Sequence, residues 1–176
     1  MKDTHYTPEI LSDKLISYID FTDVRTIADF CVGNGALLKA AQKKKHEAIF
    51  FGSDISQKVI KQLKKAYSYW NLSHCDFINA KSRHRSSIFK TNKSGFDLII
   101  LNPPFSCRGG TIFNVELNGE DYKVSTSMLF LVESIKYLAK SGTLYAILPI
   151  SVAYSEKDRK VWSKLVLDYN LHILEE

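Results

Sequence analysis

The sequence predicts an α/β protein built on a mostly parallel β-sheet with helices on both faces. Two observations predict it. Short apolar stretches alternate along the 176 residues with stretches of helical period. A glycine turn, Gly33-Asn34-Gly35, also follows the first apolar stretch and opens a helix. A strand, a glycine turn and a helix form the first unit of nucleotide-binding α/β proteins.

The length and composition indicate one soluble domain. The chain is 45% hydrophobic and 24% charged, as is common for globular proteins. No apolar run approaches the roughly 20 residues that span a bilayer, and no signal-peptide core follows Met1. Cys31, Cys75 and Cys107 are odd in number and widely spaced, so we expect no disulfide framework, no metal site and a cytoplasmic location. The net charge of +5 permits an anionic partner without identifying one.

The N-terminal half is expected to contain three helix-strand repeats. A first helix opens at Tyr6-Thr7-Pro8, with Thr7 as N-cap and Pro8 in the first helical position, and stops near residues 20–23. The periodicity then predicts strands over residues 26–32, 48–54 and 72–77, and helices over residues 36–45 and 57–69. The latter helix carries a solvated basic face, formed by Lys58, Lys61, Lys64 and Lys65.

The C-terminal half continues the alternation after two loops. Residues 81–85 and 90–95 predict a polar, basic loop, and residues 106–122 a long irregular loop. We expect strands over residues 96–101, 143–148 and 170–174, and helices over residues 127–138 and 157–168. Ser141-Gly142 is expected to end the helix over residues 127–138, and Pro149 the strand that follows.

The residues at the strand ends suggest what the sheet binds. The glycine turn has Leu38 where a dinucleotide fingerprint has its third glycine. As a ligand of this turn, a small zwitterionic group is therefore favoured over a pyrophosphate. A tight turn without a ligand would explain the two glycines equally well. Asp54 ends its strand as an acid that can accept both ribose hydroxyls. Asp76 can accept an adenine amino group, with Phe77 or Ile55 against the ring.

The tetrapeptide Asn102-Pro103-Pro104-Phe105 ends the strand of residues 96–101. Neither proline has an N–H, so the sheet ladder stops there. The Asn102 side-chain oxygen and the rigidly aimed Pro103 carbonyl can each accept one N–H of a planar amino group, while Phe105 stacks on the attached ring system. A simple turn after a strand is the alternative.

Taken in order, these motifs resemble the class I S-adenosylmethionine-dependent methyltransferases. More narrowly, they are similar to the gamma-type N6-adenine DNA methyltransferases of restriction-modification systems. The resemblance covers nearly the whole chain and rests on Tyr6-Thr7-Pro8, Asp29-x-Cys31-x-Gly33-x-Gly35, Asp54, Asp76-Phe77 and Asn102-Pro103-Pro104-Phe105. It implies a Rossmann-like methyltransferase sheet whose C-terminal strands are missing. It also implies one domain over residues 1–176, with residues 1–25 as the cofactor-pocket helix, residues 26–176 as the catalytic core and no target-recognition domain.

The resemblance also implies roles for individual residues. Thr7 and Pro8 would line the pocket for the methionine carboxylate of S-adenosyl-L-methionine, and Asp29, Gly33 and Gly35 would hold its methionine end. Asp54 would bind the ribose, and Asp76 and Phe77 the adenine. The implied cofactor contacts are Tyr6, Thr7, Pro8, Asp29, Cys31, Gly33, Gly35, Asp54, Ile55, Asp76, Phe77 and Asn102. Asn102, Pro103, Pro104 and Phe105 would form the catalytic element that holds a flipped adenine of DNA. A separate recognition subunit, or a recognition domain C-terminal to this segment, would select the target.

The sequence is also compatible with two other functions. Methyltransferases that act on protein glutamine or RNA guanine are similar at the Asn-Pro-Pro-aromatic element, because both acceptors present the same planar NH₂ group. The second alternative is a truncated module that binds cofactor or DNA without turnover. A dehydrogenase fits less well, because the pyrophosphate fingerprint is absent and hydride transfer has no use for Asn102-Pro103-Pro104-Phe105.

Overall fold

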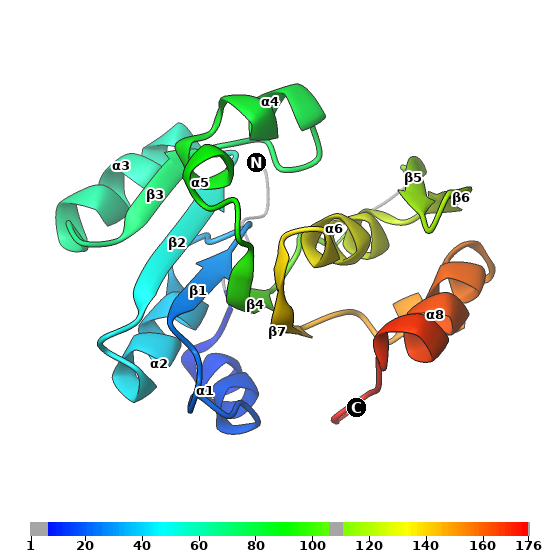
Figure 1. The fold of residues 1–176 in the computed structure, drawn as a ribbon, viewed down its shortest axis with the longest axis horizontal. Coiled ribbons are helices and arrows are strands. Elements are labelled where there is room, and N and C mark those ends of the chain that lie inside the picture. The colour runs from blue at the N-terminus through cyan, green and yellow to red at the C-terminus, as the bar shows by residue number, and fades with distance from the viewer. Residues whose placement is uncertain (1–6, 106–110, 176) are drawn as a thin grey trace. The chain divides into compact units, whose positions relative to one another are not determined.

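The computed structural model describes residues 7–105 and 111–175, which form two compact units. The first unit comprises residues 7–102 and 134–147 and contains the sheet shown in Figure 1. The second comprises the described parts of residues 103–133 and 148–176. Within the described ranges, no helix combines the length and the apolar character needed to cross a membrane.

A five-stranded parallel sheet is the centre of the first unit. In spatial order its strands are β3 (Asn71–His74), β2 (Ile49–Asp54), β1 (Thr26–Asp29), β4 (Phe96–Leu101) and β7 (Leu138–Ala146). Every neighbouring pair is parallel, which confirms the predicted sheet. The chain moves outward from β1 to β3 and then returns to β4, so the strand order reverses between β1 and β4. In such sheets a ligand binds at this reversal, outside the carboxyl ends of the strands.

Helices flank the sheet and close its core (Figure 1). Those of the first unit are α1 (Glu9–Ser17), α2 (Ala36–Lys44), α3 (Gln57–Ala66), α4 (Ala80–Arg85) and α5 (Ser87–Thr91). Ile27 and Ala28 of β1 and residues 98–101 of β4 are fully buried, as expected for strands covered on both faces. On α3 the four lysines of the basic face are all exposed, as predicted.

The loop predicted at residues 81–85 and 90–95 is wrong over most of its length, because residues 80–85 form α4 and residues 87–91 form α5. The Asn79 side chain accepts hydrogen bonds from the backbone N–H groups of Lys81 and Ser82 and so begins α4. Ile88, which is 2% exposed, anchors α5 to the core. The basic composition of this segment favoured a loop, so the prediction overlooked the cap Asn79 and the buried Ile88.

The predicted end of the helix over residues 127–138 is also wrong. Helix α6 (Thr126–Ile135) ends earlier, and β7 begins at Leu138, so Gly142 lies inside a strand. A Cβ at Gly142 would overlap the carbonyl oxygen of Phe96. The glycine therefore allows β7 to approach β4 closely, next to a register shift between Phe96 and Leu98.

The second unit contains an antiparallel hairpin, β5 (Phe113–Leu117) and β6 (Glu120–Val124). Part of the loop predicted over residues 106–122 is therefore ordered sheet. The turn is Asn118-Gly119, with φ values of 53° and 82°, which is the residue pair that a two-residue hairpin favours. Helices α7 (Ser151–Tyr154) and α8 (Glu156–Tyr169) follow. The strand predicted over residues 170–174 is absent from the described chain, since Asn170 ends α8 in a left-handed conformation.

Asp158 joins three segments of the second unit and yields a stability prediction. Its buried carboxylate accepts the Ser125 backbone N–H at 2.8 Å and the Ser155 hydroxyl at 2.9 Å, while Ser155 in turn caps α8. We expect Asp158→Ala to lower the free energy of unfolding by about 2–3 kcal/mol, because the buried Ser125 N–H loses its acceptor. Asp158→Asn retains that acceptor and should cost less. Urea unfolding of both variants tests this order, and equal losses would contradict it.

Candidate functional site

The predicted site residues of the first unit gather along one edge of the sheet. Asp29 and Asp54 are the last residues of β1 and β2, and Asn102 directly follows β4. Asp76 lies two residues beyond the end of β3. Because all these strands are parallel, their carboxyl ends lie side by side, and the structure brings together residues that lie up to 73 positions apart in the sequence.

Backbone hydrogen bonds tie the turn after β1 to the end of β2. The Gly33 N–H donates to Asp54 Oδ2 at 2.9 Å, and the Val32 N–H donates to the Ser53 carbonyl oxygen at 2.9 Å. Gly33 and Gly35 have positive φ values of 50° and 81°, a conformation that residues with a Cβ rarely adopt. The turn is therefore fixed with its backbone beside the Asp54 carboxylate. Asp54 Oδ1 accepts the Ser56 N–H at 2.7 Å, and each carboxylate oxygen keeps a second lone pair for a ligand.

Asp29 is an acid buried at the bottom of this turn. Only 2% of it is exposed, and its Oδ1 accepts the Cys31 N–H at 2.9 Å. Burial raises the pKa of Asp29 to about 7, and the negative charge of Asp54 adds to that rise. None of the described basic residues forms an ion pair with Asp29. A buried carboxyl group of this kind gains most from a cationic ligand such as a primary ammonium.

The Cys31 thiol interacts with both Asp29 and Asn102. Burial raises the pKa of the Cys31 thiol well above its usual value, and the neighbouring Asp29 raises it further. The Asn102 backbone N–H also contacts this sulfur. Cys31 therefore lines the site as a neutral thiol, which is a poor nucleophile. The described residues also hold no group of three or more His, Cys, Asp or Glu side chains that could bind a metal.

The acid after β3 sits in a second turn. The Asp76 backbone N–H donates to the Ser82 hydroxyl at 3.0 Å, and Asp76 Oδ1 accepts the Ile78 N–H at 3.3 Å. The Phe77 ring does not face this edge, because it is 2% exposed and stacks on Phe30 at a centroid distance of 4.7 Å. The expectation that the Phe77 ring covers an adenine is therefore corrected. Ile55, which is 66% exposed, is the apolar side chain left for that contact.

Asn102 presents an unpaired oxygen at the end of β4. Its Nδ2 donates to Thr7 Oγ1 at 2.8 Å. Its Oδ1 is buried and has no hydrogen-bond partner among the described residues. A buried acceptor without a donor is costly, so this oxygen is suited to receive an N–H from a ligand. Pro103, Pro104 and Phe105 follow in the second unit, where Phe105 is 43% exposed.

The predicted start of α1 needs a correction. Pro8 occupies the N-cap position and Glu9 is the first helical residue, and no side chain caps the helix. Thr7 is thus not the N-cap, and its hydroxyl oxygen accepts from Asn102 instead. Tyr6, the remaining predicted contact of this segment, lies outside the described residues.

Three side chains that support the site were not predicted. The Ser53 hydroxyl donates to the Phe30 carbonyl oxygen at 3.2 Å, and Ser82 fixes the Asp76 turn. Arg83 donates to the Phe77 and Ile78 carbonyl oxygens. A helix cap at Asn79, shortly after Asp76, was the sequence signal that could have placed Ser82 and Arg83 near the site.

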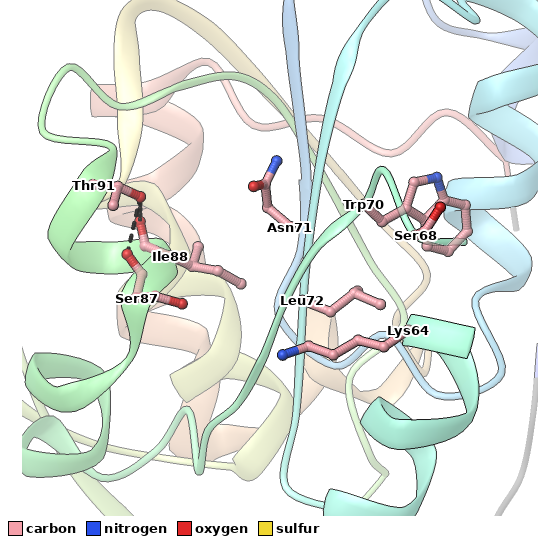
Figure 2. A pocket seen from close by; sticks show the side chains of 8 residues that line it. All are labelled: Lys64, Ser68, Trp70, Asn71, Leu72, Ser87, Ile88 and Thr91. Atoms are coloured by element: carbon pink, nitrogen blue, oxygen red, sulfur yellow. Dashed lines mark hydrogen bonds between the residues drawn. The ribbon is translucent and has the colours of Figure 1, made fainter. Parts of the chain in front are cut away.

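A cavity of about 440 Å³ lies elsewhere, at the outer edge of β3 (Figure 2). Side chains from α3, the loop between α3 and β3, β3 and α5 line it, namely Lys64, Ser68, Trp70, Asn71, Leu72, Ser87, Ile88 and Thr91. None of them is a predicted site residue. The Thr91 hydroxyl already bonds to the Ser87 and Ile88 carbonyl oxygens, as the dashed lines in Figure 2 show. The cavity therefore lacks the acids and the unpaired amide that mark the carboxyl edge of the sheet.

Comparisons with known proteins identify the family of this chain. The family model described as "Methyltransferase small domain" matches residues 8–165. An uncharacterized protein of Mycoplasma genitalium is 30% identical over 154 residues, which cover 80% of this chain and 32% of that protein.

Two solved methyltransferases share the fold. The methyltransferase subunit of a type I restriction-modification system from Streptococcus thermophilus superposes with a TM-score of 0.70 at 18% identity, covering 93% of this chain and 38% of that one. A plantazolicin methyltransferase solved in complex with a pentazolic desmethylPZN analog and SAH superposes with a TM-score of 0.51 at 17% identity, covering 91% of this chain and 58% of that one. The chain thus spans about a third of the length of the Mycoplasma protein and of the restriction-modification subunit.

Proposed function

Because this chain belongs to the methyltransferase small domain family, we propose that it transfers a methyl group to N6 of an adenine in DNA. The observation that carries the proposal is the buried, unpartnered Oδ1 of Asn102 at the carboxyl end of β4. This oxygen can accept one N–H of a planar amino group. Its position beside β1, where the strand order reverses, is where ligands bind in such sheets.

The methyl donor is S-adenosyl-L-methionine, whose sulfonium carries a methyl group that is already activated for direct transfer. The residues of the carboxyl edge suit it. Asp29 is a buried carboxylate without a cationic partner among the described residues, and the ammonium at the methionine end of the cofactor would be that partner. Asp54 would accept the ribose hydroxyls, and Asp76 the adenine amino group. A row of acids would repel a pyrophosphate, which supports this cofactor over a dinucleotide.

Asn102 and Pro103 would prepare the acceptor amine for attack. An exocyclic amine is a poor nucleophile, because its lone pair is delocalised into the ring. Two acceptors, Asn102 Oδ1 and the Pro103 carbonyl oxygen, would draw the two N–H bonds toward a tetrahedral arrangement and localise that lone pair. Phe105 would stack on the flipped base and offset part of the cost of unstacking it. The protein then contributes positioning and electrostatic stabilisation, with no covalent enzyme intermediate.

DNA adenine is the acceptor favoured by the order of the motifs, with Thr7-Pro8 before the glycine turn and Asn102 after β4. The shared fold of a restriction-modification methyltransferase subunit supports the same choice. That subunit is much longer than this chain, so the proposal includes a recognition domain or a separate recognition subunit that selects the DNA sequence.

Mass spectrometry of methylated products tests the proposal. The protein is incubated with S-adenosylmethionine and unmethylated DNA, with RNA and protein acceptors in parallel, and each product is digested. N6-methyladenine in the DNA, absent with Asn102→Ala, is the expected result. Methylguanine in RNA or methylglutamine in protein would show that the acceptor is RNA or protein instead of DNA adenine. No product from any acceptor, with cofactor still bound, would indicate either a catalytic core that needs its recognition part or a module that binds without turnover.

The role of Asp54 has its own prediction. We expect Asp54→Ala to weaken cofactor binding by about ten-fold or more, because the variant loses both the ribose contact and the bond that fixes Gly33. Isothermal titration with S-adenosylhomocysteine measures the change.

Asp97→Ala is the matched control. Asp97 also accepts backbone N–H groups, from Arg25 and Thr26, but near the amino end of β4. Loss of the Asp97 carboxylate should lower the free energy of unfolding, while the affinity for the cofactor changes little. Equal weakening by both substitutions would mean that Asp54 acts only through the fold.

A further inference from the structure

The Thr7 hydroxyl makes a contact that its position in the sequence does not suggest. Thr7 precedes α1 and does not cap it, and its Oγ1 lies 2.8 Å from Asn102 Nδ2. The two residues are 95 positions apart. The Thr7 hydroxyl is therefore a partner of the amide that the proposed function places at the acceptor amine.

The segment that carries Thr7 is held firmly. The Pro8 carbonyl oxygen accepts the Ser12 N–H at 3.0 Å and the Ser12 hydroxyl at 3.2 Å. Leu15 and Ile16 of α1 are buried in the core. Lys43 of α2 forms an ion pair with Glu9 at 2.8 Å. A hydroxyl attached to so fixed a helix start can hold a partner in one orientation.

The two ends of a carboxamide have opposite hydrogen-bonding character, so the orientation of Asn102 decides its chemistry. In the observed orientation Nδ2 donates to Thr7 Oγ1, and Oδ1 has no hydrogen-bond partner among the described residues. A rotation by 180° would bury the two N–H donors of Nδ2 where Oδ1 now lies, with no described acceptor. It would also turn donors toward the donors of the substrate amine. The orientation seen here is the one that can bind an amine.

We propose that Thr7 is a positioning residue for methyl transfer: its hydroxyl oxygen holds Nδ2 of Asn102, so that Oδ1 faces the amino group to be methylated. This inference rests on the proposed function of Asn102. It differs from the role that the resemblance implies for Thr7, which is lining the pocket for the cofactor carboxylate. The two roles predict different kinetics.

Thr7→Val and Thr7→Ser separate them. Valine has the shape of threonine without the acceptor oxygen, whereas serine keeps the oxygen. We expect Thr7→Val to lower kcat by about ten-fold or more, with the KM for S-adenosylmethionine unchanged, because the amide loses one hydrogen bond and its fixed orientation. Thr7→Ser should restore most of the rate. A raised KM for the cofactor with normal kcat in Thr7→Val would overturn the proposal.

A second measurement does not depend on turnover. In ¹⁵N-labelled protein the Asn102 side-chain amide signal is assigned by its loss in Asn102→Asp. We expect one Nδ2 proton to be protected from solvent exchange in the wild type and Thr7→Ser, and the protection to be lost in Thr7→Val. Absence of protection in the wild type would overturn the proposal whether or not the protein methylates anything. Protection together with methylation of RNA or protein, and none of DNA, would refute the proposed function while the Thr7 contact stands.

Discussion

Asn102→Ala is expected to reduce methyl transfer by about 100-fold or more while the dissociation constant of the cofactor stays within a few-fold. The substitution removes Oδ1, the one buried acceptor of the described site that has no partner, and so removes a contact made with the acceptor amine. The cofactor contacts proposed at Asp29 and Asp54 remain in place. Single-turnover rates with labelled S-adenosylmethionine, together with titration of S-adenosylhomocysteine, measure the two quantities separately.

Asn71→Ala is the matched control for this experiment. It also removes an asparagine whose Nδ2 is hydrogen-bonded, here to the Phe50 carbonyl oxygen at 3.3 Å. Asn71 is the first residue of β3, at the end opposite to the carboxyl end of the strand. Its transfer rate should remain near that of the wild type. Near-normal turnover by Asn102→Ala would contradict the mechanism, and an equal loss in both variants would assign the effect to folding.

Asp29→Asn is expected to stabilise the cofactor-free protein at alkaline pH. The pKa of Asp29 is raised by burial from 3.8 to about 7 in the folded state. A raised pKa contributes stability that is fully present below pH 3.8 and is lost as the pH rises through 7, because the folded protein must then bury the charge. The loss approaches about 4 kcal/mol above pH 7. Asparagine keeps the acceptor for the Cys31 N–H and carries no charge.

Urea unfolding between pH 5 and 8.5 checks the sign. The variant should gain stability over the wild type as the pH rises, by about 3 kcal/mol across this window, with little change above pH 7.5. A constant difference across the window would mean that Asp29 does not titrate there.

The same titration should govern cofactor binding. An ammonium group competes with the proton for the Asp29 carboxylate, so affinity for S-adenosylhomocysteine should fall by up to about ten-fold for each pH unit below 7. Asp29→Asn should bind more weakly at pH 8 and lose this pH dependence. If Asp29→Asn kept the wild-type pH dependence of S-adenosylhomocysteine affinity, the ammonium would bind to a group other than Asp29.

Local patterns were sufficient for most of the sheet and for the residue types at its edge. The strands at residues 49–54 and 96–101 were found because a buried parallel strand is apolar along its whole length. Asp54 and Asn102 were found because a polar residue that ends such a strand is conspicuous. The Asn118-Gly119 hairpin was missed although its signal was present, and a basic composition concealed the cap of α4.

The sequence by itself thus determined the parallel sheet and the acids and amide that lie at or just after the ends of its strands, because periodicity and strand ends are properties of neighbouring residues. Only the tertiary structure decided how those residues are used. It paired Thr7 with Asn102 across 95 positions, turned the Phe77 ring into the core, and raised the pKa of Asp29 by burial. Hydrogen-bond partners, ring packing and desolvation depend on which distant segments meet, and no local pattern encodes them.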